Sequence, residues 1–348
     1  MRSSGRRLMP IGLVVPVVLV GWAVACALTS WRRFGVVARV PALLVNELPF
    51  LAGYLLIASI ALSLAQGDLG SVGGVIVGVV VLVELFGLVV IVRRALRAET
   101  ALHNSPPHRR PWRRILMAPL PAFRRDIVQD GNLSYGEGPR RNLDVYHRRD
   151  RPADVPVVLH FHGGGFQSGN KRREARPLIG HLVSKGMVCV SANYRLRPHV
   201  DTDEQVADCI AAIEWVRSHA HDYGGDPGRI FLLGSSAGTY LSIAAVNAGT
   251  TGIAGIVGRY GYYGNLTPQQ PMPPILVIHG ENDLLVRPSA AREFVERIRD
   301  GSNQPADYVE LPGGHHDFDP AQDVRTRLAP PWPVCKMLAN RSPHSCRG

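Results

Sequence analysis

The sequence predicts an α/β domain with a mostly parallel sheet and flanking helices, preceded by an N-terminal transmembrane helical segment. Two observations support this prediction. Across residues 126–320, short apolar runs alternate with amphipathic stretches, which is the rhythm of strands joined by crossover helices. The first hundred residues instead hold three long apolar runs of the length that crosses a lipid bilayer.

Charge is unevenly distributed along the chain. The 348 residues carry a formal net charge of +11, but residues 1–125 hold 15 Lys and Arg against 4 Asp and Glu, whereas the rest of the chain holds 24 of each. Basic residues interleaved with apolar runs fit a membrane-flanking role better than contact with a nucleic-acid backbone. We therefore expect no nucleic-acid partner. Five scattered cysteines without a CxxC pair do not indicate a disulfide framework.

Three apolar runs predict a transmembrane segment of two to three helices within residues 1–100. The first run covers residues 8–30, the second 48–67 and the third 69–92, where Glu84 is the single charge. At a rise of about 1.5 Å per residue, each run can cross a hydrocarbon core of roughly 30 Å. A cleaved secretory signal is an alternative for the first run alone, because a basic leader precedes it.

Arginines beside these runs predict the orientation of the chain. With three spans, the first loop and the region from the third span to Arg114 share one side and hold ten arginines, against three in the N-terminus. Because positive flanks favour the cytoplasm, we expect a multi-pass membrane protein whose C-terminal domain is cytoplasmic. Failure of one run to span would invert this orientation. Residues 101–125 are predicted to be a Pro- and Arg-rich linker, residues 126–320 the folded domain, and residues 321–348 an irregular tail.

Apolar patterning locates the strands and helices of the α/β domain. Continuous apolar runs predict buried strands, and apolar residues at helical spacing predict crossover helices. Ligand sites of such sheets lie at the carboxyl ends of the strands, so residues that directly follow a strand are the candidates for chemistry. The predicted strands are 155–161, 187–192, 230–233, 253–257 and 275–279, and the predicted helices are 173–185, 203–219 and 237–248.

The segment Gly234-Ser235-Ser236-Ala237-Gly238 directly follows a predicted strand and opens a predicted helix. In a GxSxG motif, the glycines leave room for a tight strand-to-helix turn that lifts the serine above the sheet. The motif alone is weak evidence, since an ordinary Gly-Ser loop has the same composition. Its place between a strand and a helix makes Ser236 the candidate nucleophile.

A second glycine-rich turn, His162-Gly163-Gly164-Gly165, follows the predicted strand 155–161. Such a turn can direct backbone N–H groups toward the oxyanion that forms during acyl transfer. Phosphate binding is the alternative use, but the GxxxxGK[ST] spacing of a phosphate loop is absent from the sequence.

A serine hydroxyl becomes a good nucleophile only when a base removes its proton, so a base and an orienting acid are expected in the order Ser, Asp, His. Asp283 lies in HGENDLLV, just after the predicted strand 275–279, and His316 lies in GGHHDFD, 33 residues later. Glu281 and His315 are the neighbouring alternatives. We favour Asp283 and His316.

Together, these ordered motifs are similar to those of the α/β-hydrolases, in the branch that contains hormone-sensitive lipase and carboxylesterases. The resemblance covers about residues 128–320, and a membrane anchor ahead of such a domain also resembles one group of bacterial lipases and esterases. It implies a triad and an oxyanion hole without metal or organic cofactor. The matching segments are HFHGGGF, SANYRLRP, GGDPGRIFLLGSSAG, HGENDLLV and a His-x-Phe after a Gly-Gly turn. The implied roles are Ser236 as nucleophile, His316 as base, Asp283 as its partner, and the backbone N–H groups of Gly164, Gly165 and Ala237 as oxyanion donors.

The sequence departs from this family in three places. Ser235 and Thr239 replace an acid and a glycine of the family's GDSAGG, and Thr239 brings a larger side chain to a helix-packing position. Residues 260–274 stand where the family often has a helix or lid, so we expect an unusually open site. The chain after Phe318 lacks the amphipathic helix that normally closes the sheet.

The sequence thus predicts a carboxylesterase or lipase that cleaves a small-molecule or lipid ester through an acyl-enzyme, anchored in a membrane bilayer. An amidase or arylformamidase would use the same triad. A non-catalytic, membrane-tethered binding module derived from a hydrolase is the alternative from another class. No metal is expected, because His160, His199, His219 and His221 do not show the spacing of metal ligands.

Overall fold

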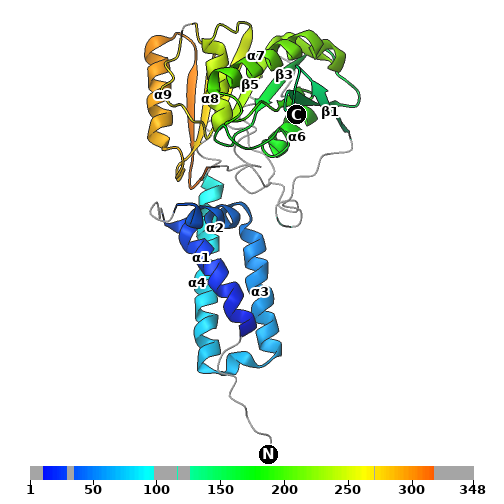
Figure 1. Ribbon diagram of the computed structural model, residues 1–348. Helices are drawn as coiled ribbons and strands as arrows, with labels where there is room; N and C mark the ends of the chain where they lie inside the picture. The colour runs from blue at the N-terminus through cyan, green and yellow to red at the C-terminus, as the bar shows by residue number, and fades with distance from the viewer. Residues whose placement is uncertain (1–10, 30–34, 98–115, 117–125, 270, 317–348) are drawn as a thin grey trace, which may run out of the picture.

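The structure is a computed structural model in which a group of apolar helices precedes an α/β domain (Figure 1). The predicted tail and nearly all of the predicted linker lie outside the residues that the structure describes. The described residues are 11–29, 35–97, 116, 126–269 and 271–316.

Within the described residues up to position 97, four α-helices form the N-terminal group, and α1 and α4 approach each other closely. A Cβ atom added to Gly21 would lie 2.5 Å from Oε1 of Glu84, and one added to Gly87 would lie 2.6 Å from a methyl carbon of Val24. Glycines therefore permit this helix contact. The helices are α1 (Ile11–Leu28), α2 (Gly35–Glu47), α3 (Pro49–Ala65) and α4 (Val72–Arg97), with the 3-10 helix η2 (Asp68–Gly70) between the last two.

Helix α4 is the one helix in the described ranges that is long and apolar enough to cross a membrane. The segments Val40–Glu47 and Pro49–Ala65 meet this test only together, and they are bent by 89° where they join. The apolar helix Leu13–Leu28 is shorter than a span. Helix α2 also occupies a region that the sequence treats as a loop. By length and composition, the third predicted run is a full-length span, and the second is one only together with the end of α2. The first predicted run forms a helix that is shorter than a span.

The α/β domain is built on one eight-stranded sheet of order β1-β2-β4-β3-β5-β6-β7-β8. Strand β2 runs antiparallel to both of its neighbours, and β4, β3 and β5 to β8 are parallel to one another. This arrangement brings the carboxyl ends of β3, β5, β6 and β7 to one edge. The strands are β1 (Ile127–Ser134), β2 (Asn142–Arg148), β3 (Val155–Phe161), β4 (Val188–Ala192), β5 (Gly225–Ser235), β6 (Ile253–Arg259), β7 (Ile275–Gly280) and β8 (Ala306–Leu311).

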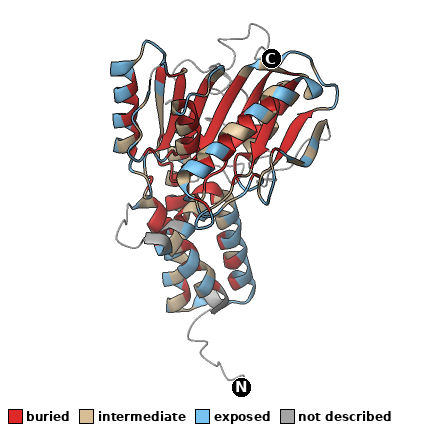
Figure 2. Cartoon of the chain, turned by 45° about the horizontal axis from the view of Figure 1, so that its top comes forward, coloured by how far each residue is buried: buried red, intermediate tan, exposed pale blue. Residues whose placement is uncertain are grey.

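Helices lie on both faces of this sheet, whose strands are largely buried (Figure 2). Side chains alternate between two cores, as in β3, where Val157 and Leu159 join the core under α7 to α9 and Val158 joins the core under α6. The flanking helices are α6 (Arg176–Ser184), α7 (Thr202–His219), α8 (Ala237–Asn247) and α9 (Pro288–Gly301), with the 3-10 helix η3 (Ala220–Tyr223) after α7.

The structure contains every strand and helix that the sequence predicts in the α/β domain, with ends shifted by a few residues. Among the described strands and α-helices of this domain, β1, β2, β8 and α9 were missed. The described residues between 260 and 274 contain no helix or strand, so no helical lid is present there.

The larger side chain at Thr239 is accommodated by glycines on the neighbouring strand and loop. Its hydroxyl donates a hydrogen bond to the Gly234 carbonyl oxygen over 2.9 Å. A Cβ atom on Gly258 or on Gly261 would lie only 2.7 Å from the Thr239 methyl carbon. The methyl group thus fills the space that these two glycines leave, and α8 packs against β6 without disturbance.

We therefore expect Gly258→Ala to destabilise the domain by about 1–3 kcal/mol, because overpacking forces side chains and backbone apart. The loss should be much smaller in a Thr239→Ser background, since serine keeps the hydroxyl and removes the methyl group. Thermal unfolding of the four proteins of this double-mutant cycle measures the coupling. Equal losses in both backgrounds would show that the methyl contact does not limit packing here.

Candidate active site

Ser236 occupies a sharp turn between β5 and α8 that only glycine neighbours allow. Its backbone adopts φ 51° and ψ −115°, a strained combination for a residue with a side chain. A Cβ atom at Gly234 would lie 2.4 Å from the Thr239 Cα, and one at Gly238 would lie 2.0 Å from the Phe161 carbonyl oxygen. Backbone from β3 and α8 thus passes where larger side chains would stand, as expected for a nucleophile elbow.

The structure brings Ser236, His316 and Asp283 together from three separate loops. His316 Nε2 lies 2.9 Å from the Ser236 hydroxyl oxygen, and His316 Nδ1 lies 2.7 Å from Asp283 Oδ2. With the ring proton on Nδ1, the imidazole donates to the carboxylate and accepts from the serine hydroxyl. All three side chains are buried, with Ser236 exposed by 9%.

Asp283 is held by four donors. Its Oδ1 accepts the backbone N–H groups of Leu285 and Val286, each over 2.9 Å. Nε2 of the buried His279 lies 3.1 Å from Oδ2, the oxygen that also contacts His316. Burial alone would raise the pKa of Asp283, but the hydrogen bonds from His279 and His316 hold this pKa well below its ordinary value. The carboxylate is therefore ionised at neutral pH.

Glu281, the acidic alternative to Asp283, has a different role. Its Oε2 accepts the backbone N–H of Gly313 over 2.7 Å, within the turn that leads to the histidine pair. His316 supplies the ring that contacts both Ser236 and Asp283. His315 is also buried. The edge of the Tyr260 ring packs on the imidazole of His316, with a centroid separation of 5.0 Å.

The glycine-rich turn after β3 lies directly against the nucleophile. A Cβ atom on Gly163 would be 3.0 Å from the Ser236 Cβ, and the Gly163 N–H donates to Glu174 Oε2 over 2.7 Å. Gly164 and Gly165 both have positive φ, at 118° and 61°. Across the described parts of the chain, the backbone N–H groups at positions 164, 165 and 237 donate no hydrogen bond within the protein. They are thus available to a bound group.

Sequence reasoning missed three residues around this site, which are His279, Glu174 and Tyr240. His279 is the penultimate residue of β7, and its place near the strand end was a usable signal. Glu174 is buried, but it lies in a charged stretch whose pattern predicts exposure to solvent. Phe166, Tyr240 and Tyr262 form a cluster of aromatic rings 5.5–5.9 Å apart beside the turn.

Ser235, which stands where the resembling family has an acid, is fully buried beneath the nucleophile. Its hydroxyl lies 3.3 Å from Nε2 of His160, whose Nδ1 lies 2.9 Å from the Ser191 hydroxyl. Burial, with a smaller contribution from the Arg259 charge, lowers the pKa of His160 well below its ordinary value. This imidazole is therefore neutral. No group of three or more His, Cys, Asp or Glu side chains in the described ranges could hold a metal ion.

Comparisons with known proteins agree with this architecture. The BD-FAE family model matches residues 143–265. The chain is 34% identical over 247 residues to the probable carboxylic ester hydrolase LipM of Mycobacterium tuberculosis, covering 56% of this chain and 57% of LipM. It is 32% identical over 256 residues to the esterase LipQ of the same organism, covering 59% and 61%. The chain thus spans about three fifths of the length of these curated relatives.

A solved structure shows the same fold. The thermophilic esterase Est2 of Thermogutta terrifontis superposes with a TM-score of 0.53 at 22% identity, covering 64% of this chain and 95% of that enzyme. A likeness at this level of identity concerns the fold. It shows that the chain has the α/β-hydrolase fold, and the matches to LipM and LipQ show that its sequence is similar to those of carboxylic ester hydrolases.

Proposed function

We propose that the protein is a serine hydrolase of carboxylic esters that works through an acyl-enzyme. The observation that carries this proposal is the continuous hydrogen-bonded chain Ser236–His316–Asp283, set beside backbone N–H groups that have no partner within the described protein. A nucleophile, its base and an oxyanion site are the three components that acyl transfer requires. The names of the relatives LipM and LipQ favour esters as the substrate class.

In the first half of the reaction, the Ser236 hydroxyl oxygen attacks the ester carbonyl carbon, and its proton passes to His316 Nε2. The carbonyl oxygen becomes an oxyanion that the N–H groups of Gly164, Gly165 and Ala237 stabilise. The tetrahedral intermediate collapses, the bond to the alcohol oxygen breaks, and His316 returns the proton to this leaving oxygen. The acyl group then remains on Ser236.

In the second half, a water molecule attacks the acyl carbon and gives a proton to the same nitrogen of His316. Collapse of the second intermediate releases the carboxylic acid and returns the proton to Ser236. Asp283 remains ionised throughout, holds the ring with its proton on Nδ1, and stabilises the imidazolium that forms in both halves.

The alternatives have less support. An amidase or arylformamidase would need the same triad, and the ester hydrolase names of the curated relatives favour an ester over an amide. A non-catalytic binding module would not need a serine, an imidazole and a carboxylate within hydrogen-bond distance of one another. The triad geometry therefore favours an enzyme.

We further propose that the N-terminal helices anchor the protein in a membrane. Of the 23 large hydrophobic side chains that are exposed in the described residues, 21 lie between Val15 and Val89, and only Tyr262 and Leu285 belong to the α/β domain. Such a concentration of exposed apolar surface requires a cover, and acyl chains of a bilayer provide one. The seven arginines within residues 93–114 follow the third run, and the short loop before it holds only Asp68, so a cytoplasmic α/β domain remains part of this proposal.

Replacing Ser236 by alanine should abolish labelling by a fluorophosphonate probe, in which the serine oxygen displaces fluoride from phosphorus. Hydrolysis of p-nitrophenyl acetate should fall by at least about 10³-fold, because no acyl-enzyme can form. Replacing the neighbouring buried Ser235 by alanine is the matched control and should leave labelling intact. Full labelling of folded Ser236→Ala protein would overturn the assignment of the nucleophile.

Asp283→Asn should lower kcat by about 10³- to 10⁴-fold, since an amide can favour the wrong tautomer of His316 and cannot stabilise its imidazolium form. Glu281→Gln is the control from the same loop. Its amide oxygen can still accept the Gly313 N–H, so kcat should stay within about threefold of the wild-type value. Steady-state kinetics on both variants separate the two acids, and the reverse result would assign the orienting role to Glu281.

A charge on the exposed face of α4 distinguishes a lipid-facing helix from a water-facing one. Val83, near the centre of α4, is exposed by 65%. In water, Val83→Arg should change stability by less than about 0.5 kcal/mol. In a bilayer, a central arginine costs about 2.5–3.5 kcal/mol on insertion scales, so the amount of chain in the membrane fraction should fall clearly.

Alkaline carbonate extraction of cell membranes followed by immunoblotting measures this effect. Gln304→Arg, at an exposed position of the α/β domain, should leave the membrane-bound amount unchanged. A wild-type chain that is extracted into the soluble fraction, or a Val83→Arg chain retained like the wild type, would contradict a lipid-facing α4.

A further inference from the structure

The glycine-rich turn beside Ser236 has a conformation that its own sequence does not explain. Gly164, Gly165 and Phe166 all have positive φ, and the value for Phe166 is 67°. Glycine adopts this region freely, whereas a residue with a Cβ atom does so only when its surroundings hold it there. Something outside the turn must therefore fix Phe166, and with it the direction of the preceding N–H groups.

Gln205, on the first turn of α7, makes that contact. Its Nε2 donates one hydrogen bond to the Phe166 carbonyl oxygen and another to the Arg195 carbonyl oxygen, each over 2.9 Å. The backbone N–H of Arg197 donates to the same Phe166 oxygen over 3.0 Å. The side chain of Gln205 is fully buried, so these bonds do not compete with solvent.

Stability alone does not account for a glutamine at this position. The Gln205 Oε1 atom is buried and has no hydrogen-bond partner within the described residues, which is a cost to the folded state. The opposite orientation of the amide would place this oxygen against two carbonyl oxygens. The side chain thus contributes two N–H donors, and one of them binds the Phe166 carbonyl oxygen in the glycine-rich turn.

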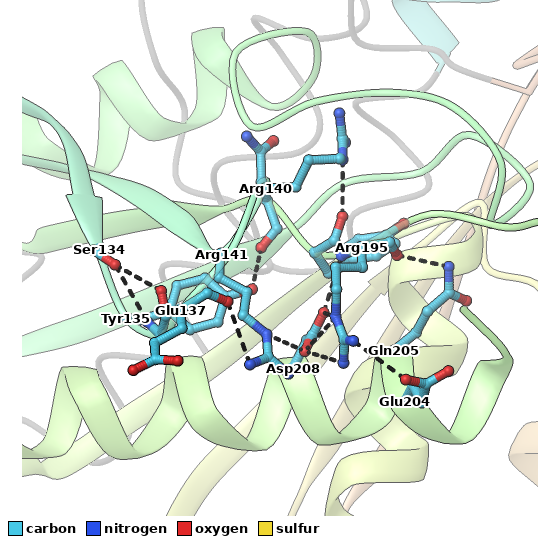
Figure 3. A network of polar contacts seen from close by, with 12 residues as sticks. Ser134, Tyr135, Glu137, Arg140, Arg141, Arg195, Glu204, Gln205 and Asp208 are labelled. Atoms are coloured by element: carbon cyan, nitrogen blue, oxygen red, sulfur yellow. Dashed lines mark hydrogen bonds and ion pairs between the residues drawn. The ribbon is translucent and has the colours of Figure 1, made fainter. Parts of the chain in front are cut away.

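The part of α7 that carries Gln205 is held by a network of polar contacts (Figure 3). Asp201 and Glu204 form a reciprocal capping box at the start of α7. One turn further along, the buried Asp208 accepts hydrogen bonds from the backbone and guanidinium of Arg195 and from the guanidinium of Arg141. Helix α7 and the Arg195 segment, which Gln205 bridges, are therefore fixed relative to each other.

The other end of the turn is held independently by Glu174, which accepts the Gly163 N–H. Between these two attachments, the N–H groups of Gly164 and Gly165 have no partner within the described protein. We propose that Gln205 is a positioning residue for the oxyanion site: by holding Phe166 in its left-handed conformation, it aims the N–H groups of the turn at the oxyanion. This inference rests on the ester hydrolase function proposed above.

Two substitutions remove the donors of Gln205. Gln205→Glu keeps the shape and replaces the amide by an acceptor, and Gln205→Met keeps the length without any polar group. For the full-length protein in detergent, we expect both to lower kcat for p-nitrophenyl acetate by about 10- to 100-fold, somewhat less than the loss of one oxyanion donor. KM should stay within about threefold, because the turn acts on the tetrahedral species and not on the bound ester.

A trifluoromethyl ketone provides a readout that a general structural defect would not produce. Ser236 adds to its carbonyl carbon, and the resulting hemiketal oxyanion occupies the oxyanion site. If Gln205 acts by positioning, the inhibition constant should rise in proportion to the loss of kcat/KM. Asp226→Ala, near the start of β5 and away from the turn, is the control. It removes the ion pair with Arg229 and the acceptor of the Gly228 N–H, so it should lower Tm while kcat stays within about twofold.

These results separate the two proposals. If wild-type protein is not labelled by fluorophosphonate and hydrolyses no ester, the hydrolase function fails. If the wild type is active and folded Gln205→Met and Gln205→Glu proteins keep wild-type kcat and inhibition constant, the positioning role is overturned and the hydrolase function stands. If KM rises while kcat and the inhibition constant are unchanged, Gln205 affects ester binding and the positioning role is likewise overturned.

Discussion

The site depends on a steric constraint where β5 turns into α8. Helix α8 approaches strand β3 so closely there that a Cβ atom at Gly238 would lie 2.0 Å from the Phe161 carbonyl oxygen of β3. This approach sets Ser236 at the carboxyl edge of the sheet, against the turn that follows β3. Because β7 is parallel to β6 and β6 to β5, the loop after β7 ends at the same edge and delivers Asp283. The arrangement of the triad is thus a consequence of sheet direction and of two positions without side chains.

Electrostatics at this edge centre on the carboxylate of Asp283. Two backbone N–H groups and two imidazoles face it. Burial would raise its pKa, but the hydrogen bonds from His279 and His316 hold this pKa well below the ordinary aspartate value of about 3.9. A carboxyl group with a lowered folded-state pKa contributes stability that is present above its unfolded-state pKa and is lost as the pH falls toward the folded-state value. The ionised form that orients His316 is therefore also the form that the fold stabilises at neutral pH.

The sequence predicts the central strands and the triad because these features are local. Val155–Phe161 is an apolar run interrupted only by His160, and the GxSxG motif lies directly after another apolar run. Strands β1 and β8 were missed because they lack this signal: β1 contains Gln, Asp and Asn, and β8 has an exposed or half-buried interior. Helix α9 was missed although its inward face, with Phe294 and Ile298, has helical spacing.

Contacts between distant segments could not be predicted. Glu174 and Gln205 lie 31 positions apart and meet the same glycine-rich turn from opposite ends. Their local patterns indicate only a charged stretch and a helix N-terminus, and burial of both follows from tertiary packing alone. The prediction of the membrane segment is incomplete for a different reason. Hydropathy identifies apolar runs, but it contains no information about the bend between α2 and α3.

The replacement of an acid by Ser235 changes the charge under the nucleophile. Ser235 contacts a neutral, fully buried His160, and the buried Arg259, whose carbonyl oxygen accepts the Ser236 N–H, carries a positive charge in the same region. An acid at position 235 would place a second buried anion close to the serine, in addition to Asp283. With a neutral hydroxyl at position 235, the buried region next to Ser236 does not contain that anion. Because the reaction builds negative charge on the substrate oxygen above Ser236, a buried region without an extra anion favours the transition state over the ground state.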